Sequence, residues 1–178
     1  INPEDFPNSI TSEKIIITPN ESGYISEALN LNIDIAEKNT VVINAAVGQG
    51  KTTAILEVLK KFYHETDYLI FIASPFVSLV EQYFVATTKL GIPEDEIYRY
   101  ELIGNKFSQD AYNCRIQIVT VNCLLGNPGD DSLQSSKEKR NYINYLSKKC
   151  KDDGKKVVFI YDEIHDAIHN FKQNFVFN

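Results

Sequence analysis

Short apolar runs alternate along the chain with segments in which apolar residues recur at helical spacing. Four of these runs are rich in β-branched and aromatic residues, and they occupy residues 40–45, 69–73, 116–120 and 155–161. The first and the last are apolar enough to be strands buried on both faces of a parallel sheet. Strands that alternate with helices predict an α/β domain of three layers, with helices on both faces of a mainly parallel sheet.

Two of the intervening segments have clear helical periodicity. A helix is predicted to begin near Lys51, because apolar residues then recur at helical spacing. These residues are Ile55, Leu56, Val58, Leu59 and Phe62. A second helix precedes the last strand and carries apolar residues at core spacing, namely Tyr142, Ile143, Leu146 and Cys150.

The breaks between these elements are short. Residues 91–93 contain glycine and proline, and residues 127–132 contain asparagine, proline and glycine, all typical of turns. Neither break is long enough to be a domain linker. We therefore predict one domain at residues 21–178. A polar arm at residues 1–20, ending in a short strand at residues 14–17, is predicted to precede it.

The loop between the first predicted strand and its helix is rich in glycine. Residues 45–53 are Ala-Ala-Val-Gly-Gln-Gly-Lys-Thr-Thr. Glycine allows close backbone approaches, and the N–H groups at a helix start form an anion site. In a phosphate-binding loop Lys51 would reach the β- and γ-phosphates, and Thr52 would bind magnesium. The usual pattern has glycine where this chain has Ala45, so a plain turn beside a surface lysine is the alternative.

An acidic pair, Asp162 and Glu163, follows the last predicted strand directly. Ligands of open α/β sheets bind beyond the carboxyl ends of the strands. There, one carboxylate can orient the water shell of a metal ion and the other can polarise an attacking water. Together with the glycine loop, the pair predicts a magnesium–nucleotide site.

These motifs resemble those of superfamily 2 helicases. Residues 45–52 are similar to motif I, in which alanine is usual at the first position, and residues 162–165 are similar to the DExH motif II. Residues 74–82 resemble motif Ia, and the strand at 116–120 ends at a threonine where the family often has one. The resemblance covers roughly residues 24–166. It implies the first RecA-like lobe of an ATP-dependent helicase or translocase that acts on DNA or RNA.

The resemblance implies a role for each matching residue. The phosphates of ATP would be held by Ala46, Val47, Gly48, Gln49, Gly50, Lys51, Thr52 and Thr53. Thr52 would bind the magnesium ion (Mg2+) directly, and Asp162 would bind it through water. Glu163 would position and deprotonate the attacking water, with Lys51 as the second catalytic residue. His165 would couple the nucleotide site to a second lobe, and nucleic acid would contact Pro75, Ser78 and Thr120.

Some features depart from the family pattern. Phe76 and Val77 stand where motif Ia usually has Thr-Arg, and Ile25 stands after Tyr24 where many relatives have an adenine-reading glutamine. The second lobe, with its arginine finger, is not in the chain. Because the chain starts with isoleucine and contains no methionine, we expect a fragment of a longer protein, inactive as an ATPase by itself.

Composition indicates a soluble domain with a core. The chain has 178 residues with 43% hydrophobic content, and no apolar run approaches the roughly 20 residues that span a membrane. The three cysteines, Cys114, Cys123 and Cys150, are odd in number and lack metal-type spacing. Buried, reduced thiols in a cytoplasmic protein are expected.

The net charge of −6 differs from the basic footprint of most nucleic-acid-binding domains. Basic residues do gather on the predicted helix before the last strand, at Lys137, Lys139, Arg140, Lys148, Lys149 and Lys151. Since the same helix has a core face, a solvated outer face is favoured over a binding patch.

Two alternatives to a motor remain open. His165 and His169 are spaced as in the His-Glu-x-x-His zinc site, although Asp166 would have to replace the glutamate base. The chain could also be a binding module on an inactive ATPase scaffold, against which the intact Lys51 and Glu163 argue.

Overall fold

The computed structural model of the chain describes residues 15–32, 41–99, 113–121, 123 and 133–163. The chain divides into two compact units, Ile1–Ala54 and Ile55–Asn178. The boundary falls within helix α2, Lys51–His64. In the described ranges, no helix is long and apolar enough to cross a membrane.

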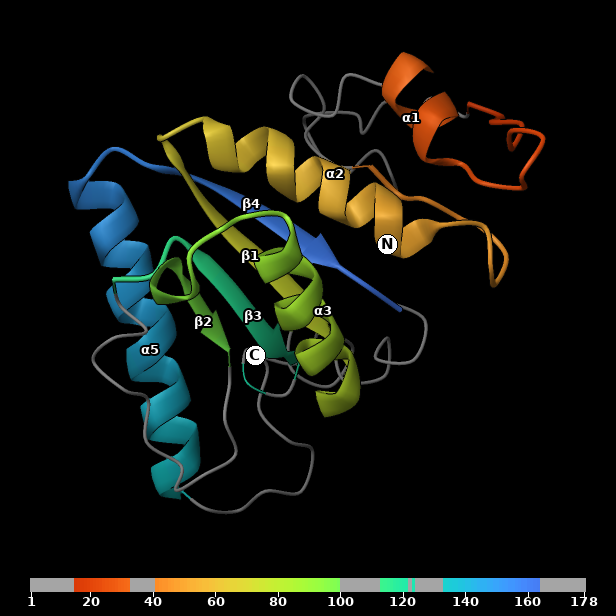
Figure 1. The fold of residues 1–178 in the computed structure, drawn as a ribbon. Helices are drawn as coiled ribbons and strands as arrows, with labels where there is room; N and C mark the ends of the chain where they lie inside the picture. Colours follow the sequence, from red (N-terminus) through yellow and green to blue (C-terminus); the bar gives the residue numbers. More distant parts are fainter. Residues whose placement is uncertain (1–14, 33–40, 100–112, 122, 124–132, 164–178) are drawn as a thin grey trace, which may run out of the picture. The chain divides into compact units, whose positions relative to one another are not determined.

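The second unit is built on a four-stranded sheet in which all described strands run parallel (Figure 1). In space the order is β2 (Ile97–Arg99), β3 (Ile116–Thr120), β1 (Tyr68–Ser74) and β4 (Lys156–Tyr161). The predicted α/β class and parallel sheet are confirmed. Strand β2 was not predicted, because a run of three residues carries too little pattern to be recognised.

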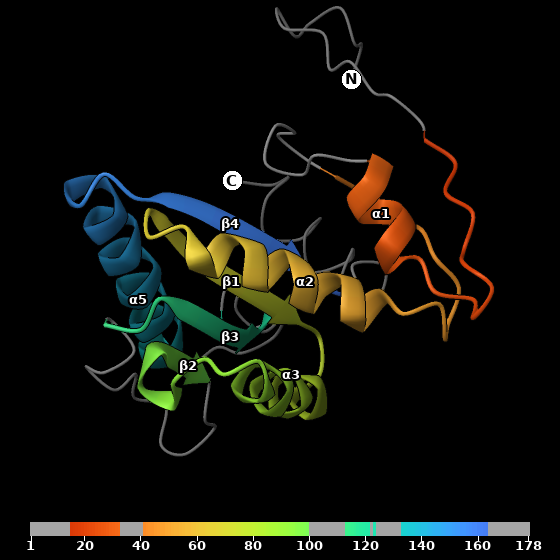
Figure 2. The ribbon, with the colours of Figure 1, turned by 45° about the horizontal axis from the view of Figure 1, so that its top comes forward.

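Helices pack on both faces of this sheet. Helix α5, Leu133–Asp152, shares a buried cluster with Leu69, Phe71 and Ala73 of β1. Side chains alternate along a strand, so Ile70 and Ile72 point to the opposite face, and both are fully buried. Helix α3, Val77–Lys89, contacts three of the strands from that face and lies beneath the sheet in Figure 2.

Strand β4 is less buried than its sequence predicts. Val157 and Phe159 are 52% and 48% exposed, whereas β1 and β3 are buried almost throughout. The physical reason is position, because β4 is an edge strand of the described sheet and pairs there with β1 alone. The expectation that it is buried on both faces is therefore wrong for this structure.

The first unit contains helix α1, Ser26–Asn32, and the glycine loop. Two predicted strands are not formed here. Residues 15–17 and 41–46 have irregular backbone, and Val42 is 80% exposed. A strand exists only where another strand hydrogen-bonds to it, and β-branched residues provide a preference without providing that partner. The strand predictions for residues 14–17 and 40–45 are wrong for the residues that the structure describes.

Candidate functional site

The glycine loop turns sharply before α2. Gly48 and Gly50 have φ angles of 83° and 77°, a left-handed conformation that side chains with a Cβ rarely adopt. Gln49 closes the turn twice, since its backbone N–H donates to the Ala46 carbonyl at 3.4 Å and its Oε1 accepts from the Ala46 N–H at 2.7 Å. The two glycines therefore stand where the backbone requires them.

Helix α2 begins at Lys51, directly after this turn. The N–H of Ala54 donates to the Gly50 carbonyl at 3.0 Å, so the amides of residues 51–53 precede the first helical hydrogen bond. Thr52 and Thr53 are exposed, and the Lys51 ammonium donates to the Ala45 carbonyl at 3.2 Å. Amides, hydroxyls and one ammonium gathered at the positive end of a helix form a chemistry suited to phosphate.

The segment before α1 lies against the same loop. The Ile25 N–H donates to the Gln49 carbonyl at 3.0 Å, and the Tyr24 ring lies beside Gly50. The Ile25 side chain is only 5% exposed. The position of the family's adenine-reading glutamine is thus filled by an apolar side chain that is buried, while its backbone supports the glycine loop.

In the second unit, Asp162 lies at the carboxyl end of β4, one residue beyond the strand. Its backbone N–H donates to the Ala73 carbonyl at 2.9 Å, which continues the ladder to β1. Its side chain is 9% exposed and accepts a hydrogen bond from the Tyr83 hydroxyl, 2.7 Å from Oδ2. The sheet therefore holds the backbone of Asp162, and helix α3 holds its carboxylate.

Glu163 has a left-handed backbone, with φ of 55°, the only such non-glycine residue among those described. This conformation costs roughly 1–2 kcal/mol for a residue with a Cβ. Strain of this kind concentrates at functional sites. The left-handed backbone at Glu163 turns the chain just after β4, and the Glu163 side chain is half-buried there.

The predicted nucleic-acid contacts lie at the same end of the sheet. Thr120 is the register partner of Ser74, and Pro75 follows Ser74 directly. Ser78 is exposed in the first turn of α3, whereas Thr120 is only 6% exposed. The neighbouring Phe76 and Val77, 51% and 48% exposed, present apolar surface there.

The basic helix has the orientation that its pattern predicts. In α5, Tyr142, Leu146 and Cys150 face the core, while Lys148 and Lys151 are exposed. The side chains of residues 133–140 lie outside the described set, and so do His165 and His169.

All three cysteines fall within the described residues, and each is buried without a disulfide, as expected from the sequence. Burial raises the pKa of the Cys150 thiol, and the nearby Asp153 adds to this while Lys155 opposes it.

Sequence reasoning missed Tyr83, which contacts Asp162. Its place at helical spacing between Val80 and Thr87 predicts a core position, and all three are buried. A buried tyrosine hydroxyl usually finds a partner, so a polar contact could have been predicted. The identity of that partner could not, because 79 residues separate it from Tyr83.

Comparison with known proteins places the chain in a family. It matches the family model "Type III restriction enzyme, res subunit" over residues 14–177. Searches of curated proteins and of solved structures gave no match. The family match and the parallel α/β sheet agree on the class of domain. The chain therefore belongs to the family of type III restriction enzyme res subunits, whose domain is a helicase-like P-loop ATPase of superfamily 2 with a RecA-type fold.

Proposed function

We propose that the chain is the ATP-binding lobe of a motor that couples ATP hydrolysis to unwinding of, or movement along, nucleic acid. The observation that carries this proposal is the turn at Gly48–Gly50, which leads directly into the start of α2 at Lys51. Membership of a helicase-like ATPase family and the acidic pair at the end of β4 support it.

The residues fit the proposed ligands chemically. Phosphate oxygens accept hydrogen bonds, and the loop offers the amides of residues 46–53 with the Lys51 ammonium. Magnesium prefers hydroxyl, carboxylate and water oxygens, which Thr52 and Asp162 supply. Magnesium held there would supply positive charge that offsets the negative charge of the phosphates. The loop and Asp162 belong to different units, so their joint action rests on the motifs and on the family.

Glu163 is the proposed general base. Its carboxylate would orient the attacking water and accept its proton, while Lys51 stabilises the negative charge on the phosphoryl oxygens. The left-handed backbone at Glu163 supports this role, because such strain is retained where a side chain must take one direction.

DNA is the first nucleic acid to test, since the family takes its name from a restriction enzyme. Pro75 and Ser78, beyond the end of β1, are the proposed contacts. Thr120 is the weaker candidate, because its side chain is almost fully buried. A second RecA-like lobe would complete the motor in the full-length protein.

The test is ATP hydrolysis by the full-length protein with duplex DNA, single-stranded DNA or RNA. We expect stimulation by one of them and loss of nucleotide binding in Lys51→Ala, measured by calorimetry. Lys60→Ala is the matched control, because Lys60 is an exposed lysine of the same helix. Equal nucleotide affinity in Lys51→Ala and wild type would remove the loop from the site. Binding without any stimulated turnover would favour the scaffold alternative.

A further inference from the structure

Asp162 is held by two different elements of its unit. Strand β1 fixes its backbone through the Ala73 carbonyl, and helix α3 holds its side chain through Tyr83. Both side chains are buried, with Tyr83 1% exposed. A buried carboxylate and a buried hydroxyl each lose hydration, so this hydrogen bond satisfies both groups at once.

The hydrogen bond from Tyr83 also sets the orientation of the Asp162 carboxylate. Rotation about the last torsion of an aspartate is broad, so packing alone defines its oxygens poorly. Donation from Tyr83 to Oδ2 selects one orientation. Because an ionised carboxylate has about four lone-pair sites, it can accept this bond and still hold a metal-bound water.

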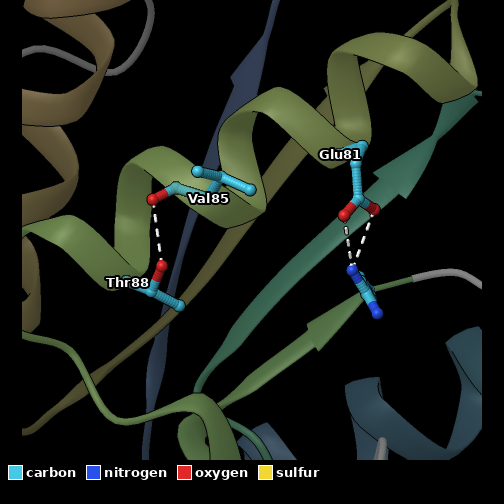
Figure 3. A network of polar contacts seen from close by, with 4 residues as sticks. Glu81, Val85 and Thr88 are labelled. Carbon is cyan, nitrogen blue, oxygen red and sulfur yellow. Dashed lines mark hydrogen bonds and ion pairs between the residues drawn. The ribbon is translucent and has the colours of Figure 1, made fainter.

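Helix α3 is anchored by contacts that do not involve Tyr83. Arg99 of β2 donates to both carboxylate oxygens of Glu81, at 2.7 and 2.9 Å, and its guanidinium lies 4.3 Å from the centroid of the Phe84 ring. Figure 3 shows Glu81 on α3 with both oxygens directed at this donor, and Thr88 bonded to the Val85 carbonyl one turn later. Loss of a single hydroxyl at position 83 should therefore leave the helix in place.

We propose that Tyr83 is a positioning residue for Asp162, which sets the orientation in which that carboxylate receives the hydrated magnesium ion. This inference rests on the proposed function, in which Asp162 is a magnesium residue. Hydrogen-bond partners of metal-binding groups typically contribute a factor of about 10–100 in metal affinity or activity.

Tyr83→Phe in the full-length protein tests the proposal, because it removes the hydroxyl and keeps the buried ring. The magnesium concentration for half-maximal ATP hydrolysis should rise roughly tenfold, and saturating magnesium should restore the rate. Nucleotide binding without magnesium should not change. The matched control is Tyr142→Phe, which removes another buried hydroxyl, one that donates to Gln117. A merely structural effect would appear equally in both variants.

Asp162→Asn separates this inference from the proposed function. If Asp162→Asn impairs magnesium-dependent hydrolysis and Tyr83→Phe behaves like Tyr142→Phe, the positioning role is wrong and the motor assignment stands. If Asp162→Asn retains wild-type magnesium dependence, the metal role of Asp162 is wrong, and the inference with it. In the double variant Tyr83→Phe/Asp162→Asn, the Tyr83 substitution should have no further effect on magnesium dependence. The effects of substitutions at two interacting residues do not add.

Discussion

A Cβ atom added at Gly50 would lie 2.9 Å from Cδ1 of Tyr24, a separation that real Cβ atoms essentially never show. Gly48, two residues earlier, has a similar positive φ, yet an added Cβ would meet nothing within 4 Å. The two glycines of this loop are thus required for different physical reasons. Gly48 is required by backbone conformation alone, and Gly50 is required by conformation and by the neighbouring ring.

Gly50→Ala should therefore weaken nucleotide binding more than Gly48→Ala. Both variants carry the left-handed penalty of roughly 1–2 kcal/mol, and only the first also clashes with Tyr24. Calorimetry with ADP and thermal unfolding measure the two effects. Adding Tyr24→Ala to Gly50→Ala should recover part of the loss and should bring no recovery to Gly48→Ala. Equal losses in the two single variants would contradict a role for the ring.

Two substitutions at Glu163 separate the effect of its strained backbone from the effect of its carboxylate. Glu163→Gln should stop ATP turnover while sparing nucleotide binding, because the amide has nearly the shape of the carboxylate but does not accept the proton. Glu163→Gly should also be inactive, yet more stable by up to about 1 kcal/mol, since glycine adopts the left-handed backbone without cost. Steady-state hydrolysis and denaturant unfolding measure these outcomes. Wild-type turnover in Glu163→Gln would show that another group activates the water.

The two histidines beyond the described residues distinguish a motor from a zinc enzyme. His169→Ala should keep nucleotide binding and nucleic-acid-stimulated hydrolysis close to wild type, whereas His165→Ala should weaken stimulation more than binding. A zinc site would need both nitrogens, so loss of either would release metal and activity together. Elemental analysis of the purified protein provides the readout. Stoichiometric zinc that disappears in both variants would overturn the motor assignment.

The Cys150 thiol should make stability depend on alkaline pH. Burial raises its folded pKa above the ordinary value of 9.0, so the folded state favours the protonated thiol. The contribution of the protonated Cys150 thiol to the free energy of unfolding is fully present below the thiol pKa of the unfolded state. It is lost as pH rises through the thiol pKa of the folded state. As pH rises past the ordinary thiol value of 9.0, the free energy of unfolding should fall more steeply for wild type than for Cys150→Ala. Parallel pH profiles would show that the thiol does not ionise differently in the two states.

Patterns that depend on local chemistry were predictable. Strands β1 and β3 were predicted to within one residue at each end, because a strand covered on both faces must be apolar throughout. The start of α2 at Lys51 was predicted, since helical periodicity begins where the glycine turn ends. The order of motifs was sufficient for the resemblance to helicases, which the family match then bore out.

Features that depend on partners distant in sequence were decided by tertiary structure. Residues 41–46 have a strand-like composition and irregular backbone, because pairing depends on which segment lies alongside. Val157 and Phe159 are exposed because β4 lies at an edge of the described sheet, a position that its composition does not encode. The bond from Tyr83 to Asp162 arises because α3 packs on the sheet and so brings Tyr83 to the residue that follows β4. Residue types and spacing therefore determined the family and the candidate chemistry of this protein, whereas the packing of helix on sheet decided which side chain orients its buried carboxylate.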